Sequence, residues 1–127
     1  MIELKDRIFF LNKIHLFGGL KDDQLAAIAV TLEERALLAD EVIFVRGAKP
    51  DGFYLIFKGK VKVTRPRENG SDFLAILSAG DYFGEEALFE KRDRSATLTT
   101  TEDSILLFLS RDEFAWTGSD PRTAHFR

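Results

Sequence analysis

One segment of the chain, Gly80 to Ala96, combines residue types that could together bind a phosphate group. Its two glycines allow the backbone to approach a ligand closely, and the run Glu85 to Phe89 favours one turn of helix. The first N–H groups of such a turn point outward and can bind an oxyanion. Arg94 can supply the compensating positive charge if the chain returns after the turn, and Ser95 adds a hydroxyl group beside it.

Glu85 lies in the same segment, where its negative charge would repel a phosphate. An ionised carboxylate is, however, a strong hydrogen-bond acceptor for hydroxyl groups. An anion site beside a hydroxyl acceptor is the pattern expected for a ribose phosphate. From the residues alone, Arg94 could instead be a surface arginine that pairs with Asp93 or Glu90. Glu85 could likewise be solvated, or pair with Arg94 in an empty site.

The composition argues against most kinds of catalytic chemistry. The chain has no cysteine, which excludes disulfides, cysteine-ligated zinc and iron–sulfur clusters. Its two histidines, His15 and His125, stand near opposite ends, and the sequence suggests no third ligand, so we expect no metal site. No serine–histidine pairing is evident either. We therefore expect no catalytic residues and no enzyme activity.

Charge and hydropathy indicate a cytoplasmic protein. The net charge of −3 gives no general reason to bind nucleic acid or an anionic membrane. The longest apolar run, Leu25 to Val30, is far shorter than the ~18 residues that a membrane-spanning helix needs. The first residues mix both charges where a signal peptide would be apolar. We expect no membrane insertion.

The elements that must position this segment change in character along the chain. Apolar residues recur at helical spacing in the first third, and two glycines interrupt them, which predicts two helices within residues 1–34. The residues are Ile8, Leu11 and Ile14, then Gly18 and Gly19, then Leu25, Ile28, Ala29 and Leu32.

From about residue 35 the sequence reads as short strands separated by turns. Strands are predicted at 42–45, 53–57, 61–64, 72–77, 96–101 and 104–109. The pair Asn69-Gly70 is a strong signal for a hairpin turn. We predict one domain over residues 1–127, mainly β with flanking helices. In it, a small antiparallel β-roll, a double-stranded β-helix or jelly-roll-like barrel, spans 35–110, and a short C-terminal helical stub spans 111–127.

The phosphate-binding segment also resembles that of a known family. Its pattern, with an arginine nine residues after the glutamate, resembles the phosphate-binding cassette of cyclic-nucleotide-binding domains. This family includes the bacterial catabolite activator protein and the regulatory subunits of protein kinase A. The matching residues are Gly80-Asp81-x-Phe83-Gly84-Glu85-x-Ala87-Leu88 and Arg94-Ser95-Ala96, and upstream Gly47, Asp51, Phe53-Tyr54, Gly59 and Val61-x-Val63. The resemblance covers roughly residues 8 to 112.

The resemblance implies a role for each matching residue. Arg94 would pair with a cyclic phosphate, Ser95 would supply a neighbouring hydroxyl, and Glu85 would accept a hydrogen bond from the ribose 2′-hydroxyl. The remaining implied ligand-binding residues are the cassette positions Phe83, Gly84, Glu86 and Ala87, the last three through backbone N–H groups, and Val63, Leu74 and Ala75, which would line a base pocket.

The function implied is that of a regulatory sensor. It would bind a cyclic nucleotide monophosphate without a cofactor and relay occupancy to an effector domain in the same or another chain. Cyclic AMP is favoured because Arg94-Ser95-Ala96 is most similar to the catabolite-activator pattern, with cyclic GMP as the other candidate. We expect no direct contact with nucleic acid. The sequence is compatible with a homodimer as well as with a monomer. The alternatives are a degenerate relative that acts as a protein-interaction module and a cupin-like metalloenzyme on a small barrel.

Overall fold

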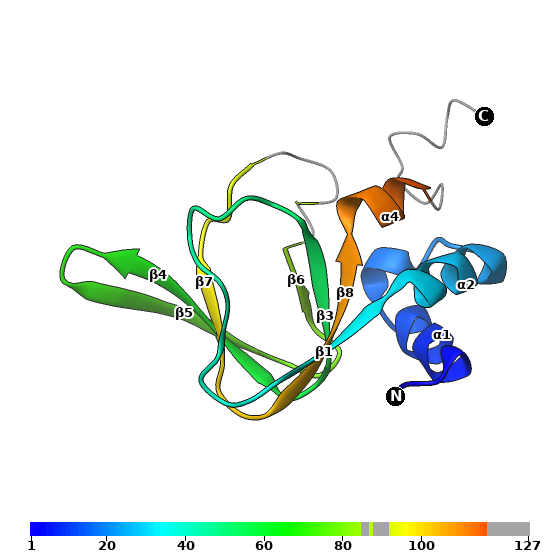
Figure 1. The fold of residues 1–127 in the computed structure, drawn as a ribbon, viewed down its shortest axis with the longest axis horizontal. Helices are drawn as coiled ribbons and strands as arrows, with labels where there is room; N and C mark the ends of the chain where they lie inside the picture. Colours follow the sequence, from blue (N-terminus) through cyan, green and yellow to red (C-terminus); the bar gives the residue numbers. More distant parts are fainter. Residues whose placement is uncertain (85–86, 88–91, 117–127) are drawn as a thin grey trace.

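Helices at the N-terminal end precede two antiparallel sheets in the computed structural model of the chain (Figure 1). The structure describes residues 1–84, 87 and 92–116. The helices are α1 (Leu4–Asn12), the short 3-10 helix η1 (His15–Phe17) and α2 (Asp22–Thr31), and α4 (Arg111–Trp116) follows the last strand. The mainly β fold with flanking helices is therefore confirmed. Of the predicted C-terminal stub, the part after residue 116 lies outside the described residues.

Each sheet of the roll has four strands. The first sheet has the order β1 (Glu33–Leu37), β8 (Ser104–Ser110), β3 (Gly52–Lys58), β6 (Tyr82–Phe83), and the second has β2 (Val42–Phe44), β7 (Thr97–Thr100), β4 (Lys60–Arg67), β5 (Gly70–Ser78). All pairs are antiparallel, as predicted. The first strand begins at Glu33, two residues before the expected boundary between helices and roll.

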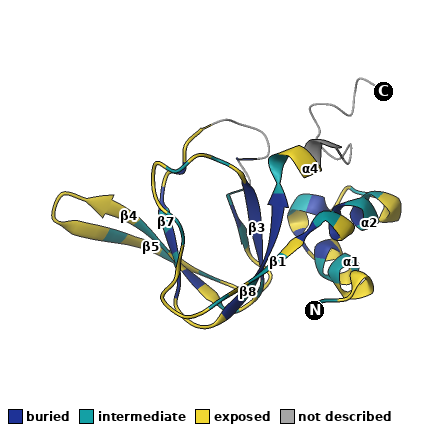
Figure 2. Ribbon diagram, in the orientation of Figure 1, coloured by how far each residue is buried: buried dark blue, intermediate teal, exposed yellow. Residues whose placement is uncertain are grey.

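β3 carries buried side chains on both of its faces, because successive residues of a strand point to opposite sides. Phe53 and Leu55 join a cluster with the N-terminal helices, whereas Tyr54 and Ile56 join a second cluster between the two sheets. Figure 2 shows β3 and β8 buried along most of their length. This central pair of strands therefore separates a helix-facing core from the interior of the roll.

The β4–β5 hairpin forms where the sequence predicted it and projects from the body of the molecule (Figure 1). Arg67 pairs with Gly70, so Glu68 and Asn69 make the turn and Gly70 follows it with φ +101°. The turn thus lies one residue earlier than an Asn-Gly turn would. Glycine adopts this positive φ without the steric strain that a side chain would cause, which suits it to the end of the turn.

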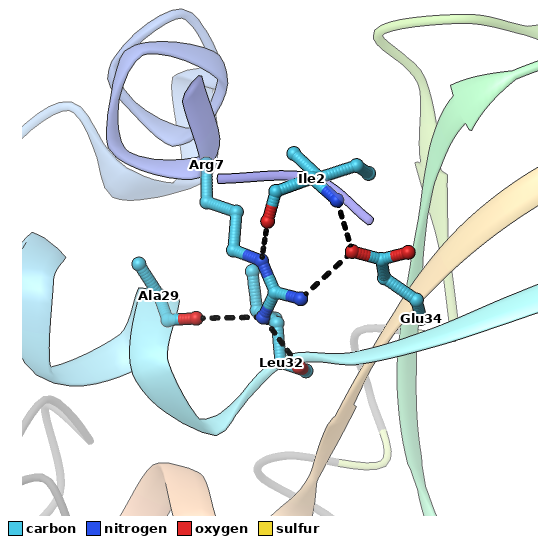
Figure 3. A network of polar contacts seen from close by, with 5 residues as sticks. All are labelled: Ile2, Arg7, Ala29, Leu32 and Glu34. Atoms are coloured by element: carbon cyan, nitrogen blue, oxygen red, sulfur yellow. Dashed lines mark hydrogen bonds and ion pairs between the residues drawn. The ribbon is translucent and has the colours of Figure 1, made fainter. Parts of the chain in front are cut away.

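One arginine fixes the helices to the roll (Figure 3). Arg7 donates from Nε to the Ile2 carbonyl at 3.1 Å and from Nη1 to the Ala29 and Leu32 carbonyls at 3.1 and 2.6 Å. Its Nη2 lies 3.0 Å from Glu34 Oε1 on β1. The last carbonyls of α2 have no partner within the helix, and a cation there also interacts favourably with the helix dipole. Arg7 therefore joins α1, the end of α2 and β1.

Candidate anion-binding site

Arg94 is the buried cation of the cassette segment. Its side chain is 2% exposed, and its backbone is tied to the turn that follows β2. The Arg94 N–H donates to the Ala48 carbonyl, and the Gly47 N–H donates to the Arg94 carbonyl, both at 2.8 Å. The chain thus returns after the cassette turn, which is the condition for Arg94 to supply positive charge there.

The Arg94 guanidinium is held at its edge and on one face. Nη2 donates to Asp51 Oδ1 at 2.9 Å and to the Gly52 carbonyl at 2.6 Å. Nη1 lies 3.4 Å from the Gly84 carbonyl, and the guanidinium carbon lies 4.1 Å from the centre of the Phe44 ring. Nε makes no hydrogen bond to the residues that the structure describes. Arg94 is therefore not a surface arginine, and its ionic partner is Asp51 rather than Asp93.

Asp51 offsets the charge of Arg94 only in part. Its side chain is 60% exposed, so water competes for the carboxylate, whereas the guanidinium that it contacts is buried. Burial and then the charge of Asp51 raise the pKa of the nearby Tyr54 phenol. A buried guanidinium with two carbonyl acceptors and one solvated carboxylate can bind a further anion, because Nε and part of Nη1 have no acceptor among the described residues.

Gly84 allows the close contact between the cassette backbone and Arg94. Its φ is +78°, and a Cβ atom added there would lie 2.5 Å from Arg94 Nη1. The buried Ala87 donates its N–H to the Gly84 carbonyl at 3.0 Å. The Ala87 carbonyl accepts from Arg111 Nε at 2.7 Å, and the Arg111 N–H donates to the Asp51 carbonyl at 3.2 Å. The start of α4 therefore touches both sides of the site.

Other predicted site residues lie at different depths. Ser95 is exposed beside Arg94. Phe83 is buried on β6, and its ring stacks on Tyr54 with centroids 5.2 Å apart and planes at 14°, which is a core position. Glu85 and Glu86 lie outside the described residues.

The three residues assigned to a base pocket share the β4–β5 pair. Val63 and Ala75 are half-buried and face each other across the two strands. Leu74 stands at a register shift between Val63 and Thr64 and is exposed. The structure thus brings two of the three together, facing the interior of the roll, and leaves Leu74 at the bulge.

Sequence reasoning missed several residues that surround Arg94. Asp51 belongs to the upstream pattern that resembles the family's first hairpins. The sequence therefore singled out this residue but did not predict its contact with Arg94. Gly52 and Arg111 carried no signal, since each acts through a backbone or long-range contact. Phe44 reads in the sequence only as one apolar residue of a short strand.

The described part of the chain contains neither a metal-ligating cluster nor a membrane-spanning helix. No group of three or more His, Cys, Asp or Glu residues there could hold a metal ion. Within the same residues, no helix has both the length and the apolar character needed to cross a bilayer.

Comparison with known proteins identifies relatives of this fold and sequence. The family model described as cyclic nucleotide-binding domain matches residues 34–117. The cGMP-dependent protein kinase, isozyme 1, of Drosophila melanogaster is 35% identical over 115 residues, which cover 87% of this chain and 15% of the kinase. A cAMP-dependent protein kinase regulatory subunit of Mycosarcoma maydis is 32% identical over 111 residues, which cover 85% of this chain and 21% of the subunit. The chain thus spans a small part of the length of these curated relatives.

A solved structure is also similar to this chain, in fold and in sequence. The crystal structure of the N-terminal domain of a transcriptional regulator from Streptomyces coelicolor A3(2) superposes with a TM-score of 0.80 at 30% identity. The match covers 91% of this chain and 84% of that one. All three matches therefore cover most of this chain, and in the two kinase-related proteins they cover a minor part of the relative.

Proposed function

Because this chain belongs to the cyclic nucleotide-binding domain family, we propose that it is a sensor module that binds cyclic AMP at Arg94. Cyclic AMP is preferred because the Arg94-Ser95-Ala96 sequence is most similar to the catabolite-activator pattern. The relatives include a kinase named for cGMP and a regulatory subunit named for cAMP. Cyclic GMP is therefore the alternative ligand that any test must include.

The observation that carries the proposal is the incomplete charge compensation of a buried guanidinium. Arg94 has one ionic partner among the described residues, the solvated Asp51, and its Nε has no hydrogen bond to them. A cyclic phosphate bears one negative charge and two free oxygens, which suits the remaining N–H groups. Gly84 lets the cassette backbone lie against the same guanidinium, so backbone N–H groups and the arginine can reach one phosphate.

The other proposed ligand contacts follow the family pattern. Ser95 would add a hydroxyl beside the phosphate, and the N–H groups of Gly84, Glu86 and Ala87 would assist it. For Ala87 this requires that its N–H turn from the Gly84 carbonyl, to which it donates at 3.0 Å in the structure. Glu85 would accept from the ribose 2′-hydroxyl, and the base would lie along β4 and β5. Its proposed neighbours there are Val63, Leu74 and Ala75. Phe83, the cassette phenylalanine, would act from its core position on β6.

We propose further that the module itself is non-catalytic, cytoplasmic, and coupled to an effector in the same or another chain. Arg111 supports the coupling, because it contacts the Ala87 carbonyl through its side chain and the Asp51 carbonyl through its backbone. A ligand that draws the cassette toward Arg94 would change these contacts at the start of α4. The relay would then be a population shift between two positions of this helix.

The direct test is a calorimetric and thermal-shift titration of the chain with cyclic AMP, cyclic GMP and 5′-AMP. At 100 Kd the ligand should stabilise the fold by ~2.7 kcal/mol, and 5′-AMP should have no effect at that concentration. A larger effect of cyclic GMP would reassign the ligand. If none of the three stabilises the protein, the degenerate, protein-binding alternative replaces the sensor.

An arginine variant tests the site itself. Arg94→Ala should weaken cyclic nucleotide binding by about 2–5 kcal/mol, because the phosphate loses its charged partner in a desolvated site. Arg65→Ala, which removes an exposed arginine of β4, is the matched control and should bind as the wild type does. Equal binding by both variants would show that Arg94 is not the phosphate ligand.

A further inference from the structure

We infer that Phe44 is a positioning residue for ligand binding: its ring face holds the Arg94 guanidinium in the orientation that meets the phosphate. The inference rests on the proposed function. The guanidinium carbon lies 4.1 Å from the ring centre, within the range at which a cation is attracted to the negative face of an aromatic ring.

The surroundings make this attraction important. Such an interaction is stronger where the cation is removed from water, and the Arg94 side chain is 2% exposed. Among the described residues, the other contacts of the guanidinium are two neutral carbonyls, of Gly52 and Gly84, and a carboxylate that is 60% exposed. The ring is thus an apolar surface that nonetheless stabilises the buried charge.

The ring is itself fixed by its neighbours. Its centroid lies 6.0 Å from that of Tyr54 and 6.0 Å from that of Phe83, and these two rings stack on each other. The pairing of β2 with β7 shifts register between Val42 and Phe44. A bulge of this kind changes the direction of a side chain. Phe44 is therefore aimed by the strand and held by two aromatic rings.

The face of the guanidinium and its edge serve different partners. Its hydrogen bonds to described residues all leave the edge, where Nη2 reaches Asp51 and Gly52 and where an incoming phosphate would also bind. The ring occupies the face and competes with none of them. Phe44 can therefore hold Arg94 both before and after a ligand arrives, which lowers the cost of ordering this long side chain on binding.

A series of fluorinated phenylalanines at position 44 tests the inference in the full chain. Each added fluorine weakens the negative potential of the ring face while changing its size little. Arg94 should then spend less time in the competent orientation, so the Kd for cyclic AMP should rise with each fluorine, by roughly 3- to 30-fold over the series. Mere packing by Phe44 predicts no such graded dependence.

The same series at Phe53 is the matched control. This phenylalanine is fully buried in the helix-facing cluster, where its ring contacts are Phe17 and Tyr82. Fluorination there should leave the Kd unchanged. If the wild type binds cyclic AMP and the Kd stays constant along the Phe44 series, Phe44 only packs and the inference is wrong while the proposed function stands. If the wild type binds no cyclic nucleotide, the proposed function and the inference about Phe44 are both wrong.

Discussion

The carboxylate of Asp51 and the guanidinium of Arg94 form an ion pair in which only one partner is buried. Asp51 Oδ1 lies 2.9 Å from Arg94 Nη2, and the two residues are 43 positions apart in the chain. The side chains are 60% and 2% exposed, respectively. The carboxylate can be hydrated without its partner, whereas the arginine cannot. Loss of Asp51 therefore leaves a buried charge that lacks its ionic partner.

The first prediction concerns Asp51→Asn. We expect the ligand-free protein to lose about 1–2 kcal/mol of unfolding free energy, because water already screens the exposed carboxylate and limits the loss. Urea unfolding measures it. Asp93→Asn is the control, since Asp93 is exposed and adjacent to Arg94 in sequence. Equal midpoints for the two variants would contradict an energetic role for the Asp51 contact.

The second prediction concerns the close approach at Gly84. Alanine there should lower stability by about 1–2 kcal/mol from its positive φ, and should also weaken nucleotide binding by displacing Arg94 Nη1. Gly80→Ala is a matched control, because Gly80 has φ +93° with nothing within 4 Å of an added Cβ. Calorimetry and unfolding of both variants separate backbone strain from the contact. Similar nucleotide affinities for the two would show that the contact does not matter.

The third prediction tests the proposed ribose contact. A hydrogen bond to a charged acceptor contributes about 1.5–3 kcal/mol, so Glu85→Gln should weaken cyclic AMP binding by roughly 10- to 100-fold. The 2′-deoxy analogue lacks the hydroxyl group and should bind the variant and the wild type with similar affinity. Calorimetry with both ligands completes the cycle. A loss of the same size for both ligands would assign Glu85 another role.

The fourth prediction concerns pH and the Arg7–Glu34 contact. The hydrogen bond from the Ile2 N–H, followed by the contact with Arg7, lowers the pKa of Glu34 below its ordinary value of 4.5. A depressed folded-state pKa adds stability above pH 4.5, and this stability is lost as the pH falls through the folded value. The wild type should therefore exceed Glu34→Gln in stability at pH 7, and the difference should shrink below pH 4.5.

Urea midpoints measured from pH 7 to pH 3 give this difference directly. Glu68→Gln, at the exposed hairpin turn, is the control for loss of a carboxylate without the Arg7 contact. A difference between the wild type and Glu34→Gln that is the same at both ends of the range would mean that Glu34 acts through packing.

Much of the fold could be predicted because most strands have strong local signals. The runs of β2, β3 and β4 contain many β-branched and aromatic residues, and the Asn-Gly pair locates the hairpin. β1 was missed because it begins Glu33-Glu34-Arg35, which does not read as a buried strand. Its charges have tertiary partners: Glu34 meets Arg7, and the Arg35 guanidinium lies 4.0 Å from the centre of the Phe108 ring. A strand stabilised by such contacts has no local signature.

The cassette residues of the candidate site could be predicted from the sequence, whereas the residues that surround Arg94 in space mostly could not. Arg94 and Gly84 are recognisable from their spacing, and the structure places them in contact. Phe44 could not be identified as a partner of Arg94, because the contact depends on the register of β2 against β7. The sequence also could not decide between a surface and a buried position for Arg94, since that depends on a turn more than 40 residues away.

The position of β5 at the edge of its sheet has a consequence for handling the protein at high concentration. The strand is nine residues long and presents exposed Phe73, Leu74 and Ile76 on a hairpin that projects from the body (Figure 2). An edge strand that exposes backbone N–H and carbonyl groups beside apolar side chains is a template for strands of other molecules. Phe73 and Ile76 lie opposite Thr64 and Lys62 on the outer face, so a lysine at either position would discourage aggregation while leaving the Arg94 site intact.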